Sequence, residues 1–144
     1  MADTDGPGSG APLRVPQGMT PEQFRSFASA VRNGAGHLGS DIQVQGRRMV
    51  GTARPDSDID IAIRVSPERF NQLIRERFGT PNPGSAKERT MLHALETGKI
   101  QAGEAGLRGL RKSLEERFGY PVDISVIREG GPFDRGPWVP LPNE

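Results

Sequence analysis

The stretch Asp58-Ile-Asp-Ile-Ala-Ile-Arg-Val65 alternates isoleucine and valine with smaller or polar side chains over its whole length. A period of two is typical of a β-strand, and the β-branched residues favour a strand inside a sheet. Asp58 and Asp60 project from one face of this strand, and the isoleucines that alternate with them project from the other. The apolar face predicts contact with a core, so the acidic face must stay open or be neutralised.

Two further segments carry the same alternation. Residues 41–45 predict a half-buried strand, and residues 121–127 predict the last strand, with Asp123 and Ser125 on the face opposite its valines. Apolar residues at helical spacing predict four helices, which span residues 21–33, 67–78, 85–97 and 104–118. We therefore expect an α/β or α+β fold, with a small mixed β-sheet and helices packed on one of its faces.

Glycine and proline are enriched at the two ends of the chain, which holds 19 glycines and 13 prolines. Glycine raises the entropy cost of ordering a segment, and proline blocks backbone pairing. We expect residues 1–18 to be a flexible linker or junction and residues 19–127 to form the folded domain. Residues 128–144 are expected to be a Gly/Pro-rich tail that packs on this domain through Phe133 and Trp138.

The overall composition excludes several kinds of site. The chain has no cysteine, which excludes disulfides, zinc–thiolate sites and cysteine nucleophiles. No apolar run approaches the roughly 18 to 20 residues that cross a bilayer, and the first ten residues lack a signal-peptide pattern, so we expect no membrane partner. A net charge of +1 predicts no general attraction to nucleic acid. Arg108, Arg111 and Lys112 form a local basic cluster that could contact RNA, and its alternative is a solvated helix face.

The acidic face of the central strand is the most informative feature. Two carboxylates about 7 Å apart on one strand face repel each other unless a cation lies between them, and a hard divalent ion such as Mg²⁺ prefers oxygen ligands. Asp123 joins Asp58 and Asp60 if its strand is a neighbour of theirs. In the alternative interpretation Asp58 caps a turn and Asp60 lies at an exposed edge. Gly46 and Gly51, in the turn or short helix before the strand, permit the close backbone approach that phosphate binding needs.

The residues from Gly46 to Asp60, with Asp123 further on, resemble the minimal nucleotidyltransferases of the DNA polymerase β-like superfamily. The signature of that family is Gly-Ser, a short basic turn, Asp-x-Asp and a third Asp, and the resemblance covers roughly residues 42–127. More narrowly, the layout resembles nucleotidyltransferase domains at the C-terminal ends of bacterial polymorphic toxins. The resemblance implies the polymerase β-like fold and Mg²⁺-dependent transfer of a nucleoside monophosphate from an NTP, such as ATP, to an acceptor hydroxyl, with release of pyrophosphate.

The same resemblance assigns roles to individual residues. Asp58, Asp60 and Asp123 would be catalytic and would hold two Mg²⁺ ions, and Asp123 would also assist deprotonation of the acceptor hydroxyl. Four positions would contact the nucleotide, with the backbone of the first approaching the β- and γ-phosphates: Gly46, Arg47, Arg48 and Ser57. Arg48 and Arg54 have an alternative as solvated loop arginines.

Arg47 departs from the family pattern, because the family has serine at this position. Serine donates one short hydrogen bond to phosphate, whereas arginine is bulkier and offers a charged fork. Three interpretations stay open: Arg47 holds phosphate itself, it faces outward and leaves the site weak, or it attenuates a toxic domain.

The expected acceptor is an RNA 3′ end, such as that of tRNA, or a hydroxyl side chain of a protein. The expected place of action is the cytoplasm of a target cell, with a cognate immunity protein as a further partner. Two alternatives remain: a binding module with a nucleotidyltransferase fold and weakened catalysis, and an antitoxin-type minimal nucleotidyltransferase.

Overall fold

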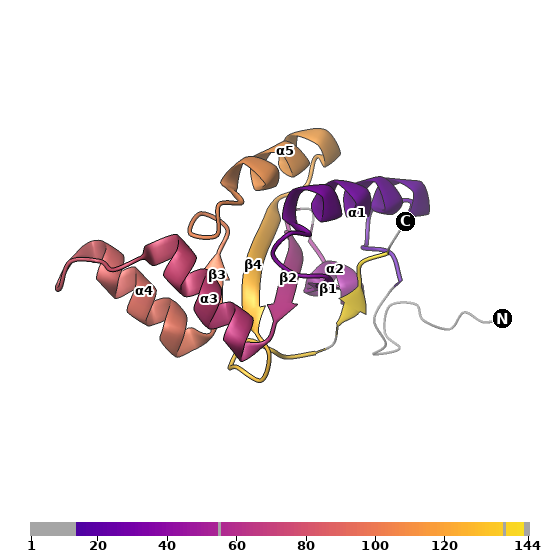
Figure 1. Ribbon diagram of the computed structural model, residues 1–144. Coiled ribbons are helices and arrows are strands. Elements are labelled where there is room, and N and C mark those ends of the chain that lie inside the picture. Colours follow the sequence, from indigo (N-terminus) through magenta and orange to yellow (C-terminus); the bar gives the residue numbers. More distant parts are fainter. Residues whose placement is uncertain (1–13, 55, 137, 143–144) are drawn as a thin grey trace.

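The computed structural model describes residues 14–54, 56–136 and 138–142, and Figure 1 shows their arrangement. The described helices are α1 (Pro21–Ala35), α2 (Arg47–Val50), α3 (Pro67–Phe78), α4 (Ala86–Thr97) and α5 (Arg108–Phe118). The described strands are β1 (Asp41–Gln45), β2 (Ile59–Val65), β3 (Lys99–Gln101), β4 (Val122–Arg128) and β5 (Val139–Pro140).

The strands form one open, mixed sheet in the order β3-β4-β2-β1-β5. β2 and β4 run parallel, and the remaining pairs are antiparallel. The apolar strand at residues 58–65 was predicted to lie inside the sheet, and it occupies the centre as β2. The expectation of a mixed sheet with helices is therefore confirmed.

One face of the sheet supplies the hydrophobic core. The residues of β2 and β4 on this face are almost fully buried; they are Ile59, Ile61, Ile63, Val65, Val122, Ile124 and Val126. α1, α3 and α5 bury their apolar residues in the same cluster. The rings of Phe27 on α1 and Phe118 on α5 meet edge to face, with their centroids 5.3 Å apart. α4 lies farther out, beside α3 and β3 (Figure 1).

The opposite face of the sheet is polar and is covered unevenly. Strand pairing places Asp60 beside Asp123 at one end of this face and Arg64 beside Ile127 at the other. The C-terminal segment after β4 covers the Arg64 end, where Asp134 accepts two hydrogen bonds from Arg64, at 2.8 and 2.9 Å. Asp41 accepts a third hydrogen bond from Arg64, at 2.7 Å. The aspartate end keeps a half-buried, polar surface.

Side-chain caps begin three of the helices. Thr20 and Gln23 form a reciprocal capping box at the start of α1, in which each side chain bonds to the other residue's backbone N–H. Ser66 and Ser85 accept hydrogen bonds from the first turns of α3 and α4. Gly34 and Gly36 were predicted to end α1; the helix continues through Gly34, and Gly36 is its C-cap.

Two strands were not predicted from the sequence. β3 has three residues and β5 has two, so neither is long enough for a period of two to be recognised. The predicted helix over residues 104–118 begins later, at Arg108. The residues before it form a turn, in which the Leu107 N–H donates to the carbonyl of Ala102.

The ends of the chain differ in part from the predicted division. Residues 1–13 of the expected linker lie outside the described residues. Gln17, in contrast, exchanges hydrogen bonds with the turn after β1: its N–H donates to the carbonyl of Arg48, and its side chain accepts from the N–H of Ala53. The ordered part therefore begins before residue 19. Within the described ranges, none of the helices combines the length and the apolar character that crossing a bilayer requires.

The ion pair between Arg64 and Asp134 yields a stability prediction. The Asp134 side chain is only 9% exposed, so Asp134→Ala leaves Arg64 half-paired and should lower the free energy of unfolding in urea by about 2 to 3 kcal/mol. Hydrogen bonds from Arg64 hold the pKa of Asp134 below its ordinary value of 3.8. This stabilisation should therefore be complete above that pH and decline as the pH falls further.

The matched control is Glu22→Ala, which removes the exposed pair of Glu22 with Arg25 at 3.8 Å. Because the Glu22 side chain is 76% exposed, the change should stay within about 0.5 kcal/mol. Equal effects of the two substitutions would contradict the importance assigned to Asp134.

Candidate active site

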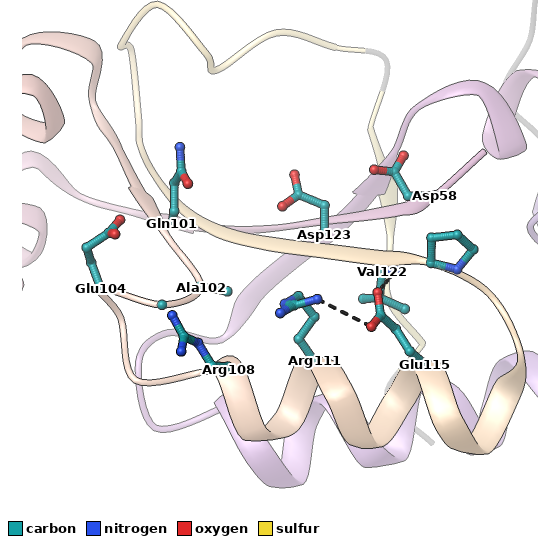
Figure 2. A pocket seen from close by; sticks show the side chains of 11 residues that line it. Asp58, Gln101, Ala102, Glu104, Arg108, Arg111, Glu115, Val122 and Asp123 are labelled. Atoms are coloured by element: carbon teal, nitrogen blue, oxygen red, sulfur yellow. Dashed lines mark hydrogen bonds and ion pairs between the residues drawn. The ribbon is translucent and has the colours of Figure 1, made fainter. Parts of the chain in front are cut away.

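The structure brings the three predicted aspartates to one end of the polar sheet face. Asp60 on β2 and Asp123 on β4 are direct partners in the parallel ladder, and neighbouring strands lie about 4.8 Å apart. Asp58 immediately precedes β2 and is exposed. Figure 2 shows the side chains of Asp58 and Asp123 pointing to the same side of the sheet. β2 and β4 are therefore neighbours in the sheet, as the predicted convergence of the three aspartates requires.

The ionised form of the Asp60 side chain is electrostatically disfavoured in this position. Burial raises its pKa from 3.8 to about 6, and repulsion from Asp123 and Asp58 contributes in the same direction. Attraction to Lys99 on β3 and a 3.3 Å hydrogen bond from the Gln45 side chain offset part of this shift. The neighbouring protein groups therefore do not fully offset the free-energy cost of ionising Asp60 in this position.

The chemistry of these side chains fits a hard divalent cation, since the exposed Asp58 and the half-buried Asp60 and Asp123 supply carboxylate oxygens at one end of the sheet. Their present arrangement is more open than a finished metal site: over the described parts of the chain, no three His, Cys, Asp or Glu side chains are gathered closely enough to hold an ion. Like charges repel at short range, so drawing the carboxylates together requires a positive charge. Asp58, Asp60 and Asp123 are the residues that would hold Mg²⁺.

The turn before β2 lies against the aspartates through Gly46. Gly46 has a φ of +97°, which L side chains rarely adopt, and a Cβ atom there would lie 3.3 Å from the Cβ of Asp60. Glycine is therefore needed both for the backbone conformation and for the close approach to Asp60. α2 follows directly and ends at Gly51, which adopts the left-handed conformation.

Arg48 differs from its predicted role as a nucleotide ligand. Its side chain is buried, with 4% exposure, and it donates to the carbonyl oxygens of Ser57 at 2.8 Å and Gln17 at 2.9 Å. Its guanidinium also lies 4.6 Å from the ring centroid of Tyr120. Backbone carbonyls thus surround the Arg48 guanidinium. From the sequence alone, this group was expected to bind phosphate. Arg48 holds the turn together.

The other predicted nucleotide contacts occupy different environments. Ser57 is half-buried, and its hydroxyl oxygen accepts a hydrogen bond from the Arg54 N–H at 2.9 Å. This bond closes the turn and leaves the hydroxyl proton of Ser57 for a further acceptor. Arg47 is exposed at the start of α2, and its guanidinium makes no hydrogen bond or ion pair with any residue that the structure describes.

A cleft of 450 Å³ adjoins the aspartates (Figure 2). Asp58 and Asp123 line it from the sheet, and Arg108 and Arg111 reach it from α5. Arg111 is paired with Glu115 at 3.3 Å, and Glu115 also accepts the N–H of Val122 at 2.9 Å. Two of the three residues in the predicted basic cluster therefore face the acidic site, and Lys112 is exposed outside the cleft lining.

Four polar residues at or near this cleft were missed by the sequence analysis, and Glu115, the partner of Arg111, is one of them. Gln101 and Glu104 line it, and Lys99 acts electrostatically on Asp60. Lys99 and Gln101 belong to β3, which is too short to show a recognisable alternation of polar and apolar residues. Only its pairing with β4 brings them to the site.

No protein-family model matches the chain, and searches of curated proteins and of solved structures likewise find no match. The functional interpretation therefore depends on the residues of the site and their geometry.

The raised pKa of Asp60 predicts a stabilising substitution. Between pH 3.8 and about 6 the folded protein binds more protons at Asp60 than the unfolded chain does, so this group makes stability fall as the pH rises through that range. At about 1.4 kcal/mol per pKa unit, ionised Asp60 costs at most ~3 kcal/mol at pH 7. Asp60→Asn should raise the free energy of unfolding by about 1 to 3 kcal/mol at pH 7 and give no gain near pH 3, as measured by urea titration.

The exposed neighbour Asp58 provides the control. Asp58→Asn should change the stability by less than about 0.5 kcal/mol. A loss of stability in Asp60→Asn at pH 7 would show that the Asp60 carboxylate serves the fold rather than a site that costs stability.

Proposed function

We propose that this protein is a Mg²⁺-dependent nucleotidyltransferase with a polymerase β-like fold, which transfers a nucleoside monophosphate from an NTP to a hydroxyl group of a macromolecule. The observation that carries the proposal is the pairing of Asp60 with Asp123 beside Asp58, at the edge of a cleft that Arg108 and Arg111 also line. Carboxylates for cations and guanidinium groups for phosphates thus face the same space.

Each group has a role in the proposed reaction. Bound divalent cations would neutralise the triphosphate and lower the pKa of the attacking hydroxyl. Asp58, Asp60 and Asp123 orient the reactants by holding those cations, and a carboxylate oxygen of Asp123 takes up the acceptor proton. The acceptor oxygen forms a bond to the α-phosphorus, the bond from that phosphorus to the bridging oxygen breaks, and pyrophosphate leaves. Arg108 and Arg111 bind phosphate oxygens of the reactants.

We further propose that the protein is a toxin domain that acts in the cytoplasm of a target cell, as in the polymorphic toxins whose layout its sequence resembles. An RNA 3′ end, such as that of tRNA, is the favoured acceptor, because Arg108, which has no ion pair with any described residue, presents a positive charge at the cleft where a phosphodiester chain would enter. A hydroxyl side chain of a protein is the alternative acceptor. A toxin of this type also implies a cognate immunity protein.

A label-transfer assay tests the reaction. The protein is incubated with Mg²⁺, total RNA or cell extract, and each NTP labelled at the α-phosphate. We expect label in an RNA band, and a loss of roughly 100-fold or more in Asp58→Asn and Asp60→Asn, because each removes a carboxylate that holds the reacting phosphate through a cation. Label in protein would identify the alternative acceptor.

Asp56→Asn is the matched control, because Asp56 is an exposed carboxylate two residues before Asp58 and has no proposed role. It should retain full transfer. The enzymatic proposal would be contradicted if the unaltered chain transferred no label, or if the Asp60→Asn variant transferred as much label as the unaltered chain.

The exposure of Arg47 favours one second candidate, a nucleotide-binding module that has lost the serine of the family signature. Arg47→Ser separates the two functions. If the chain is an active enzyme, the exposed arginine is tolerated and the substitution should change kcat/KM for the NTP by no more than about threefold. A binding module predicts instead that the restored hydroxyl creates transfer where the original has none, or raises it by about tenfold or more.

A further inference from the structure

A second cavity, of 290 Å³, opens beside the aspartate cleft. It lies among α4, β3 and the C-terminal segment that follows β4. Its lining consists of Thr90, His93, Ala94, Thr97, Lys99, Gln101, Glu104 and Phe133. Gln101 and Glu104 also line the aspartate cleft, so the two spaces adjoin.

Phe133 gives this cavity an aromatic wall. The side chain is 44% exposed, and among the described residues only Phe133 and Leu92 are large hydrophobic residues with such exposure. The Lys99 ammonium lies 4.8 Å from the centroid of the Phe133 ring. An exposed ring at the mouth of a polar cavity is a surface on which a planar heterocycle can stack.

Lys99 links the aromatic wall to the carboxylates. It contacts the Phe133 ring and also attracts Asp60 electrostatically. Strand pairing places Lys99 beside Ile127, on the same sheet face as Asp123 and across β4 from Asp60. A cation in this place suits a ligand that carries an aromatic group at one end and phosphates at the other.

The polar lining offers hydrogen bonds to the edge of such a heterocycle. The hydroxyl groups of Thr90 and Thr97 donate to helix carbonyls, at 3.1 and 2.9 Å, so their oxygens remain as acceptors. Gln101 is exposed and offers both a donor and an acceptor. The volume of 290 Å³ is at the lower end for ligand cavities, which start near 300 Å³, and therefore suits one part of a nucleotide.

We propose that this cavity binds the nucleobase of the NTP, which stacks on Phe133 while the triphosphate extends past Lys99 to the aspartates. The inference rests on the proposed function and adds to it a base-binding site on the C-terminal segment. Phe133 is a binding residue in this arrangement, and Lys99 contacts the phosphates.

Calorimetric titration in Mg²⁺ tests the proposal with two probes: the tightest binder among the α,β-methylene analogues of the four NTPs, and inorganic tripolyphosphate, which has no base. Phe133→Ala should weaken binding of the NTP analogue by about tenfold or more and leave tripolyphosphate binding unchanged. Phe133→Trp should restore binding of the analogue, because the indole ring also stacks. Thermal unfolding verifies that both variants are folded.

Leu92→Ala is the matched control, because Leu92 is 51% exposed on α4 and is not part of the cavity lining. It should leave the affinity for both probes unchanged. Equal weakening of both probes by Phe133→Ala, or no weakening of either, would overturn the base site while leaving the nucleotidyltransferase proposal intact. Failure of both probes to bind the unaltered chain would instead count against the proposed function.

A short single-stranded RNA distinguishes the source of the base. The proposal expects Phe133→Ala to leave the affinity for this RNA unchanged. If the substitution weakens RNA binding alone, the cavity accepts a base of the acceptor and the assignment to the NTP is wrong.

Discussion

Asp60 stands beside Asp123 because β2 and β4 run parallel in a single register. Side chains alternate between the two faces of a strand, so a slip of β2 by one residue would turn its isoleucines outward and force Asp60 into the core. The burial of Ile59, Ile61 and Ile63 therefore determines the register of β2. The register in turn determines where the Asp60 carboxylate lies relative to Asp123. The arrangement of the acidic site follows from the packing of the apolar face behind it.

The charged side chains on the polar face of the sheet have direct ion-pair partners at one end and weaker compensation at the other. At one end Arg64 lies between Asp41 and Asp134, and each carboxylate has a direct partner. At the other end Asp60 is half-buried beside further carboxylates, with only a distant lysine and a long amide hydrogen bond as compensation. Such unequal treatment within one sheet is typical of a protein that gives up stability at a site reserved for a ligand.

Local patterns made part of this structure predictable. Alternation identified β1, β2 and β4, and apolar residues at helical spacing identified α1, α3, α4 and α5. Carboxylate spacing identified the acidic face, because a strand has only two faces. The remainder depends on contacts between distant segments: β3 is defined only by its pairing with β4, and Gln17 and Tyr120, far from Arg48 in the sequence, help to bury it. The strand order and the cavity beside Phe133 could not be predicted, because neither corresponds to a local sequence pattern.

β5 has a consequence for the order in which the fold is completed. It pairs with β1, and Arg32 of α1 donates to the carbonyls of Leu141 and Pro142, across sequence separations of 109 and 110 residues. During synthesis, β1 therefore presents an unpaired edge until nearly the whole described chain has left the ribosome, since contacts of such separation form late. The segment that covers the Arg64 end of the sheet arrives equally late. Until then a nascent chain holds its acidic strand in a sheet whose β1 edge is open to pairing with other chains.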